Sequence, residues 1–349
     1  MNKFWVFLWV IMAMIACKNH PYPVSYKKFT LHKFEQKNTS IRAIWAVSQD
    51  TLYYAGSNGQ VGYTYNAGKD WRRLSIVYQD SLKPEFRSIA GNGQAVFVLS
   101  AGNPALLYKI EKEHINLVYK EEHPQVFYDA MAFFDTQTGI AMGDPTSGCL
   151  SVLRTTDGGE HWYKTDCKEL PKTALGEAAF AASNSNLKII DTSVWMVTGG
   201  IKARVFKSKD MGVNWQVYDT PIIQGKPTQG IYSVDFYDKN NGIIFGGDYL
   251  KPAINTQNKA ITRDGGKTWK LVADSQAPGY SSCVQYIPHS QGKKIMAVGK
   301  RGLSLSLDAG SDWKQLSDTG YYTIRFVNDS TAWLAGEEKV GLLQFTSDF

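Results

Sequence analysis

The 349-residue chain lacks several features that would each indicate a common function. It contains no apolar run of about twenty residues, the length that a membrane-spanning helix needs. Its basic residues outnumber the acidic ones and give a net charge of +6. No five or six basic residues stand together, so the charge does not indicate a nucleic-acid partner. The sequence therefore excludes neither an enzyme nor a binding protein, but it gives no sign of a membrane channel or a nucleic-acid reader.

Motifs for metals and cofactors are absent as well. The six histidines include no pair spaced four residues apart, and the four cysteines include no Cys-x-x-Cys, so no metal site is predicted. The segment Gly91-Asn92-Gly93 lacks the third glycine of a dinucleotide-binding loop and precedes a run typical of a strand rather than a helix. We therefore expect no cofactor.

What the chain has in abundance is glycine and aromatic residues. It holds 31 glycines, 19 tyrosines, 16 phenylalanines and 10 tryptophans, and 43% of its residues are hydrophobic. Aromatic side chains suit pleated surfaces and glycine suits tight turns. The composition favours an all-β fold with ample material for a core.

The first seventeen residues form a separate unit. Lys3 precedes the apolar run of residues 4–15, which is typical of a secretory signal. The segment Met14-Ile15-Ala16-Cys17 resembles a bacterial lipobox, which implies lipidation of Cys17 and an exported protein held on the periplasmic side of the outer membrane. The alternative is an ordinary signal in which Cys17 is incidental.

A repeat of the form Ser/Thr-x-Asp-x-Gly-x-x-Trp occurs four times, and a fifth copy carries Asn66 in place of Asp. These copies resemble the Asp-box, or BNR repeat, of sialidase-like β-propellers. In such a box the carboxylate accepts backbone N–H bonds within a hairpin turn and the Trp packs beneath it. We expect a structural role for the repeated residues, which are Asn66, Trp71, Asp157, Trp162, Asp210, Trp215, Asp264, Trp269, Asp308 and Trp313.

The spacing of the boxes predicts seven blades, one of them with a degenerate turn at residues 109–112 and the last cut off by the chain end. Residues 26–35 alternate apolar and polar side chains and can pair with residues 341–345 to close the ring. The predicted fold is an all-β, seven-bladed β-propeller of four-stranded antiparallel blades. Its predicted organisation is a lipoprotein signal at 1–17, a tether at 18–25 and one propeller domain at 26–349.

Polar residues recur where the inner strands open and where the second strands end, and both positions belong to the face opposite the boxes. One interpretation is that these residues pair with one another around a wet channel, and the other is that they bind a ligand. The ligand-binding candidates are Arg42, Arg87, Asp129, Asp144, Glu177, Arg204, Tyr232, Asp248, Lys300 and Glu337. Two carboxylates from Asp129, Asp144, Glu177 and Asp248 would serve a glycan hydrolase if they lay about 5 to 9.5 Å apart. The Arg-Ile-Pro segment of sialidases is missing, because Arg87 is followed by Ser88-Ile89-Ala90.

Residues 26–349 resemble the photosystem II stability and assembly factor family. They are similar too to exported bacterial propellers, some labelled oxidoreductase, in segments such as Met142-Gly143-Asp144-Pro145. The resemblance implies a non-catalytic binding or assembly module for a protein, peptide or glycan at the cell envelope, monomeric and in contact with the membrane only through its lipid. The glycan hydrolase remains the alternative.

Two cysteines flank the third-blade box symmetrically. Cys149 and Cys167 can pair across the hairpin, since export permits a disulfide, or they can remain two buried thiols. Cys283 has no partner in either interpretation.

Overall fold

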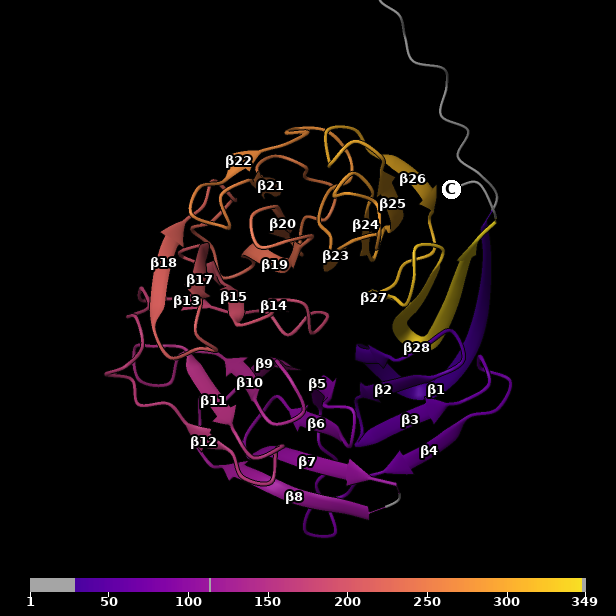
Figure 1. The fold of residues 1–349 in the computed structure, drawn as a ribbon, viewed down its shortest axis with the longest axis vertical. Helices are drawn as coiled ribbons and strands as arrows, with labels where there is room; N and C mark the ends of the chain where they lie inside the picture. The colour runs from indigo at the N-terminus through magenta and orange to yellow at the C-terminus, as the bar shows by residue number, and fades with distance from the viewer. Residues whose placement is uncertain (1–28, 113, 347–349) are drawn as a thin grey trace, which may run out of the picture.

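The computed structural model describes residues 29–112 and 114–346. The regular elements in this part of the chain are antiparallel β-strands, arranged as sheets around a central axis (Figure 1). This is the architecture of a β-propeller, in which each sheet is a blade. Within the described residues, no helix has the length and apolar character required to cross a membrane.

The described strands pair into six sheets, which we number as blades. The first blade contains β27 (Thr323–Phe326), β28 (Thr331–Phe345), β1 (Phe29–Ala46), β2 (Leu52–Gly56), β3 (Gln60–Thr64) and β4 (Arg72–Ser75). The second contains β5 (Phe86–Gly91), β6 (Val96–Ser100), β7 (Ala105–Glu111) and β8 (His114–Glu121), and the third contains β9 (Tyr128–Phe133), β10 (Gly139–Gly143), β11 (Ser151–Thr155) and β12 (Tyr163–Lys164).

The other three blades follow along the chain. The fourth contains β14 (Leu187–Ile190), β15 (Ser193–Val197), β17 (Arg204–Ser208) and β18 (Trp215–Asp219). The fifth contains β13 (Glu177–Ala178), β16 (Gly199–Gly200), β19 (Gln229–Phe236), β20 (Gly242–Asp248), β21 (Lys259–Thr262) and β22 (Lys270–Leu271). The sixth contains β23 (Cys283–Tyr286), β24 (Ile295–Gly299), β25 (Gly302–Ser306) and β26 (Lys314–Ser317).

The prediction of seven blades is wrong, because the described strands pair into six sheets. The strands expected to form a separate last blade, β27 and β28, belong to the same sheet as β2, β3 and β4. The long strand β1 is the physical cause, since its residues from Phe29 to Ser40 pair with β28, with a break after Glu35, and those from Ile41 pair with β2. Four of the six sheets have four strands, and the first and fifth have six.

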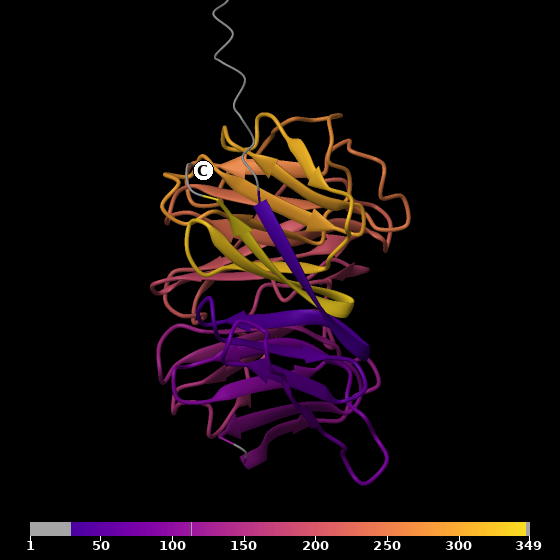
Figure 2. The same ribbon diagram turned by 90° about the vertical axis from the view of Figure 1, so that its right-hand side faces the viewer.

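Closure by the N-terminal strand is confirmed for the part of residues 26–35 that the structure describes. Phe29 pairs with Phe345 and Lys33 with Gly341 in an antiparallel ladder, so β1 and β28 run side by side (Figure 2). On the buried side of this ladder, Phe34 packs against the ring of Trp333 at 6.1 Å between centroids. The ladder leaves neither end of the described chain as an open sheet edge.

The Asp-boxes lie on the turns between the third and fourth strands of their blades, where the sequence predicts them. In the fifth blade, Thr262 donates its hydroxyl to Asp264 at 2.8 Å and accepts the N–H of Gly266 at 2.9 Å. The same carboxylate accepts the N–H groups of Lys267 and Thr268, each at 3.0 Å. Burial alone would raise the pKa of Asp264, but the hydrogen bonds outweigh it and lower the pKa to about 2.

The first box shows how Asn replaces Asp. Asn66 accepts the N–H of Asp70 at 2.9 Å with its side-chain oxygen, as the carboxylate does elsewhere. Its side-chain NH₂ donates to the Asp70 carboxylate at 2.8 Å, so the missing negative charge is supplied four residues later. The turn therefore keeps its geometry without a box aspartate.

The apolar core lies mainly between neighbouring blades. Between the second and third blades, Phe97 packs on Phe133 with ring centroids 4.8 Å apart, and Trp162 of the third-blade box contacts both rings. The box Trp residues of the third to sixth blades thus contribute to the layers between adjacent blades, whereas Trp71 packs within the first blade against Phe34 and Trp333.

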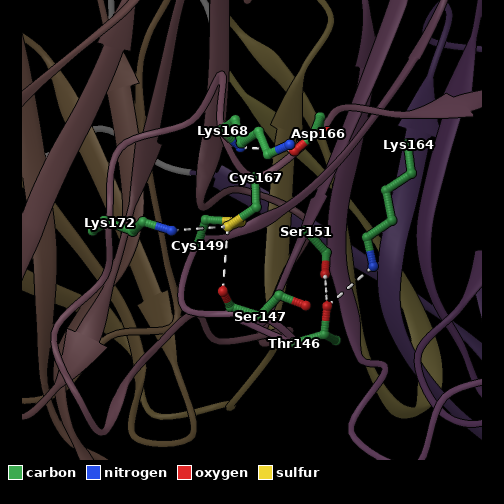
Figure 3. Close-up of a disulfide and its surroundings, with 9 residues drawn as sticks. All are labelled: Thr146, Ser147, Cys149, Ser151, Lys164, Asp166, Cys167, Lys168 and Lys172. Carbon is green, nitrogen blue, oxygen red and sulfur yellow. Dashed lines mark hydrogen bonds between the residues drawn. A yellow bond between two sulfur atoms is a disulfide. The ribbon is translucent and has the colours of Figure 1, made fainter.

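Cys149 and Cys167 form a disulfide, with Cα atoms 5.7 Å apart (Figure 3). Cys149 lies just before β11 and Cys167 just after β12, so the bond ties together the two ends of the outer hairpin of the third blade. Lys172 lies beside the bond, with its ammonium 3.7 Å from the sulfur of Cys167. Such a cross-link stabilises the fold by restricting the unfolded chain. Cys283 is buried and has no disulfide partner among the described residues.

We expect Asp264→Ala to destabilise the protein by about 1 kcal/mol near neutral pH, because two backbone N–H groups lose their acceptor. Since the folded pKa lies below the ordinary value of 3.8, the stabilisation is complete above that value and is lost as the pH falls toward 2. Urea unfolding at about pH 7 and about pH 2.5 measures the difference from the wild type.

Asp264→Asn is the matched control, because Asn66 shows that an amide oxygen supports the turn. It should retain most of the stability at neutral pH. A gap between the wild type and Asp264→Ala that stays constant down to about pH 2.5 would contradict the role assigned to the carboxylate.

Candidate functional site

The inner strands of four blades carry a β-bulge at equivalent places, where their pairing with the second strand begins. The shift of register falls between Ile41 and Ala43 in β1 and recurs at the same place in β5, β9 and β19. A bulge turns a side chain out of the regular alternation of the strand. The residues in these bulges are Arg42, Arg87, Asp129 and Tyr232.

These four side chains, with Tyr280 and Tyr322 from the openings of β23 and β27, form what we call the channel mouth. Arg87 interacts electrostatically with both Arg42 and Asp129, and Tyr280 interacts with Arg42. The structure thus brings together four candidates that the sequence placed on four separate strands.

Below the channel mouth the chain closes the channel. Residues 181–186, between β13 and β14, are all buried, and we call them the plug. Asn184 donates to the carbonyl of Ile89 at 2.8 Å and accepts the N–H of Met131 at 3.0 Å, and Ser183 donates to the carbonyl of Ser282 at 2.6 Å. The chain around β14 reaches toward the middle of the ring in Figure 1.

The plug contacts the two remaining blades as well. Ser185 donates to the hydroxyl of Ser233 in the fifth blade at 2.7 Å, and Arg325 of the first blade donates to the carbonyl of Asn184 at 2.7 Å. One segment of the fourth blade therefore joins all the others. At this level, residues 181–186 fill the axis that the sequence analysis treated as a channel.

The two arginines of the channel mouth differ in how they are held. Arg87 forms an ion pair with Glu85 at 2.9 Å and donates to the carbonyl of Ala181 in the plug at 3.2 Å. Burial, and then the charge of Arg42, lower the pKa of Arg87. Arg42 instead stacks on the ring of Tyr322, with its guanidinium carbon 4.0 Å from the ring centroid. Its Nε is buried without a hydrogen-bond acceptor in the described residues.

The carboxyl groups on the other side of the mouth are strongly desolvated. Asp129 is fully buried and neither of its oxygens has a hydrogen-bond partner among the described residues. Burial and then repulsion by Asp144 raise the pKa of Asp129 well above its ordinary value, and Arg87 only partly opposes them. Burial raises the pKa of Asp144 to about 6, although the N–H of Ala179 donates to it at 2.7 Å.

An aromatic cluster completes the mouth. Tyr232 stacks on Phe180 with parallel rings 4.0 Å apart, and Tyr280 meets Tyr232 edge-on at 4.8 Å. The hydroxyl of Tyr232 donates to the carbonyl of Thr228 at 2.8 Å, and burial raises its pKa. These rings form a rigid apolar wall next to the charged groups.

Exposed apolar side chains lie on the loops of the same face, beside the aromatic cluster. Leu175 is 97% exposed and Leu250 is 66% exposed. They come from the segment before β13 and from the loop after β20. The other exposed members in this region are Ile201, Tyr249 and Ile254. We call these five residues the apolar rim, and Tyr249 contacts Tyr232 of the mouth.

The remaining candidates lie apart from the mouth or serve the fold. Glu177 forms an ion pair with Arg204 and accepts the hydroxyl of Thr198 at 2.6 Å, so it is fully engaged. Asp248 accepts the N–H of Leu250 at 3.1 Å, which shapes the loop of the apolar rim. Glu337 accepts the hydroxyl of Tyr322 at 3.0 Å. Lys300 is exposed on the turn between β24 and β25.

The expected position of Glu177 in an inner strand is wrong. Its strand β13 pairs with β16 at the side of the fifth blade, and the inner strand of the fourth blade is β14, which begins after the plug. The sequence contains a signal for this insertion. Thirteen residues separate Ala130 from Gly143 in the third blade, whereas twenty-one separate Ala178 from Gly199 in the fourth.

On the opposite face, the inner strands surround a funnel of about 460 Å³ whose floor is the plug. An ion pair between Lys188 and Asp235, at 2.6 Å, lies on its wall, and Arg325 lines it too. Sequence reasoning missed this funnel because it treated the channel as continuous. Within residues 29–112 and 114–346, no three His, Cys, Asp or Glu side chains are grouped so as to hold a metal.

Comparison with known proteins supports the fold. The BNR/Asp-box repeat family model matches residues 260–271, and no curated protein matches the chain. A solved structure described as YCF48 bound to D1 peptide aligns with a TM-score of 0.66 at 13% identity, covering 91% of this chain and 97% of that one.

Two further structures align over similar lengths. YCF48 from Cyanidioschyzon merolae gives a TM-score of 0.65 at 14% identity, covering 92% of this chain and 99% of that one. A structure of U3-55K gives 0.62 at 11% identity, covering 90% and 98%. At these identities the likeness concerns the fold: the chain folds as a β-propeller similar to the YCF48 structures and carries a BNR/Asp-box repeat.

We expect Asp144→Asn to change how stability depends on pH. Because the folded pKa of about 6 exceeds the ordinary 3.8, the wild type loses stability as the pH rises from about 4 to above 6, and none of this loss occurs below about 4. The amide keeps the bond from Ala179, so the variant should gain at most about 3 kcal/mol relative to the wild type near pH 7.5 and nothing near pH 4.

The measurement is the urea midpoint at both pH values, with the exposed Asp219→Asn as the control for loss of one charge. An Asp144→Asn variant that is less stable than the wild type at the higher pH would show that the desolvated carboxylate is used by the fold.

Proposed function

We propose that the protein is a non-catalytic binding module that captures a protein or peptide segment at the channel mouth. The observation that supports this most strongly is Arg42. Its guanidinium stands on Tyr322 beside a second arginine, and no carboxylate of the described residues forms an ion pair with it. A desolvated cation is costly to keep unless it is paired or used.

The chemistry of the mouth defines the segment it fits. Two neighbouring guanidinium groups match a carboxylate, such as an acidic side chain or the end of a peptide chain, through forked hydrogen bonds. The aromatic cluster lies next to them through Tyr280, which interacts with Arg42. A partner segment with an acidic residue next to an apolar one would therefore contact both the arginines and the aromatic cluster.

The apolar rim supports a macromolecular partner rather than a small molecule. Exposing apolar side chains such as Leu175 and Leu250 to water is unfavourable, and their burial under a partner would lower the free energy of the complex. Burial at about 25 cal/mol per Å² makes even a few such side chains a substantial share of a binding energy. The likeness to YCF48, one structure of which is described as bound to D1 peptide, is consistent with a peptide partner.

The glycan hydrolase receives less support. Of its four candidate carboxyls, Glu177 is held by Arg204, and Asp129 is enclosed with its pKa raised well above the usual range. Hydrolysis needs one ionised and one protonated carboxyl that both reach the substrate.

The crosslinking test compares the two faces directly. A photo-crosslinking amino acid replaces Leu250 on the apolar rim or, as the matched control, Val213, which is 49% exposed on the fourth-blade box. Adducts with a partner in envelope extracts should form from position 250 and not from 213. Adding Arg42→Ala should reduce the adduct about tenfold, since a charged contact is lost, whereas the exposed Arg263→Ala should not. Equal adducts from both positions would refute the assignment of faces.

The finer part of the proposal is that the propeller is exported and lipid-anchored at the envelope. The signal and Cys17 lie outside the described residues, so the support is the lipobox-like sequence alone. Cys17→Ala should move the protein from the membrane fraction to the soluble fraction without changing its melting temperature. Retention of a cleaved Cys17→Ala protein in the membrane fraction would refute the anchor and leave the binding proposal untouched.

A further inference from the structure

A second concave site lies on the box face, between the fourth and fifth blades and away from the channel mouth. It has a volume of about 420 Å³. Four lysines from three separate turns line it: Lys207 and Lys209 from the end of β17, Lys239 from the turn between β19 and β20, and Lys267 from the fifth-blade box. We call it the lysine pocket.

The positive charge of the lysine pocket is only partly neutralised by the protein. Lys239 forms an ion pair with Asp191 at 2.9 Å. Among the described residues, no carboxylate lies within ion-pair distance of Lys207, Lys209 or Lys267. The one acidic side chain in the lining, Asp264, already accepts the N–H and hydroxyl bonds of its box turn.

Lys207 is the most constrained of the four. It is 6% exposed, donates to the carbonyl of Gly265 at 2.6 Å and lies over the ring of Trp195 at 5.2 Å. Burial, then repulsion from Lys209 and Lys267, lower its pKa. Lysines on a solvated face normally extend their ammonium groups into water. The buried ammonium of Lys207 therefore differs from that of an ordinary surface lysine.

Neutral donors line the same pocket without partners. Within the described residues, the side chains of Thr192, Ser193 and Asn240 form no hydrogen bond; Ser193 is buried, whereas Thr192 and Asn240 are exposed. Hydroxyl and amide groups beside ammonium groups are the usual surroundings of an oxyanion.

From the excess of lysines over carboxylates and the unpartnered donors around one cavity, we propose that the lysine pocket binds a phosphate or sulfate group. Lysine ammonium groups bind such an anion as point charges, and Ser193 and Thr192 supply shorter-range hydrogen bonds. The group can be a free ion or part of a lipid headgroup, since the same atoms would contact either.

The test uses the mature chain and two probes at fixed ionic strength. Inorganic phosphate is titrated by calorimetry, and vesicles of phosphatidylglycerol are compared with vesicles of phosphatidylcholine in a flotation assay. Fixed ionic strength is needed because screening alone weakens exposed lysine contacts.

The main variant is Lys209→Ala with Lys267→Ala, both exposed, so that folding is not at risk. It should weaken phosphate or phosphatidylglycerol binding about tenfold or more. The matched control, Lys168→Ala with Lys270→Ala, removes two exposed lysines outside the pocket and should leave binding within about twofold. Lys207→Met tests the buried ammonium, and its melting temperature is measured alongside.

Each outcome decides the proposal. Phosphate binding that the main variant loses supports a site for a free or ligand-borne anion, and binding confined to phosphatidylglycerol vesicles identifies the headgroup as its source. Binding of neither probe, or equal loss in the main variant and the control, overturns it. Arg42→Ala should have no effect on either probe, so failure here leaves the channel-mouth proposal intact.

Discussion

The antiparallel ladder between β1 and β28 joins segments from the two ends of the described chain and closes the ring. Without it, two edges would present unpaired N–H and C=O groups, which are costly in isolation and prone to pair with other chains. The same strand continues into the first blade, so one stretch of backbone belongs to both ends of the propeller. Closure then fixes how every other blade is oriented toward the axis.

Once the ring is closed, the plug determines what the axis can do. A propeller of this size would leave a channel, but buried asparagine and serine groups of residues 181–186 hydrogen-bond to every other blade. These bonds hold the blades in one arrangement, although the buried side chain of Asn186 in the same segment has no hydrogen-bond partner among the described residues. The result is two separate hollows on opposite faces in place of one passage.

The two faces consequently carry different chemistry. The channel mouth combines guanidinium, desolvated carboxyl and aromatic groups, whereas the box face carries hairpin turns and the lysine pocket. The box residues themselves are engaged in their turns, as the contacts of Asp264 show. The two binding proposals therefore rest on residues outside the repeated box contacts, such as Arg42 in a bulge and the exposed Lys209.

The repeats alone were enough to predict an all-β propeller, because each box is a local turn whose bonds join residues within a few positions of one another. Terminal closure followed from simple alternation in residues 26–35. The number of separate sheets did not, because pairing on both sides of β1 is a long-range choice that no local pattern records. The position of Glu177 failed for a similar reason, since β13 leaves its blade to make room for the plug.

For the candidate site, the sequence identified Arg42, Arg87, Asp129 and Tyr232 by their equivalent places in successive repeats. Only the tertiary structure decided which candidates interact and which are desolvated. It also decided which candidates, like Arg204, already form an ion pair with a neighbour. The lysine pocket was invisible in sequence because its lysines come from turns far apart in the chain. Hydrogen bonds within each turn determined the repeated unit, because they join residues close together in the sequence. The packing of distant units around an axis filled by the plug determined which polar and charged side chains of the described residues have no partner.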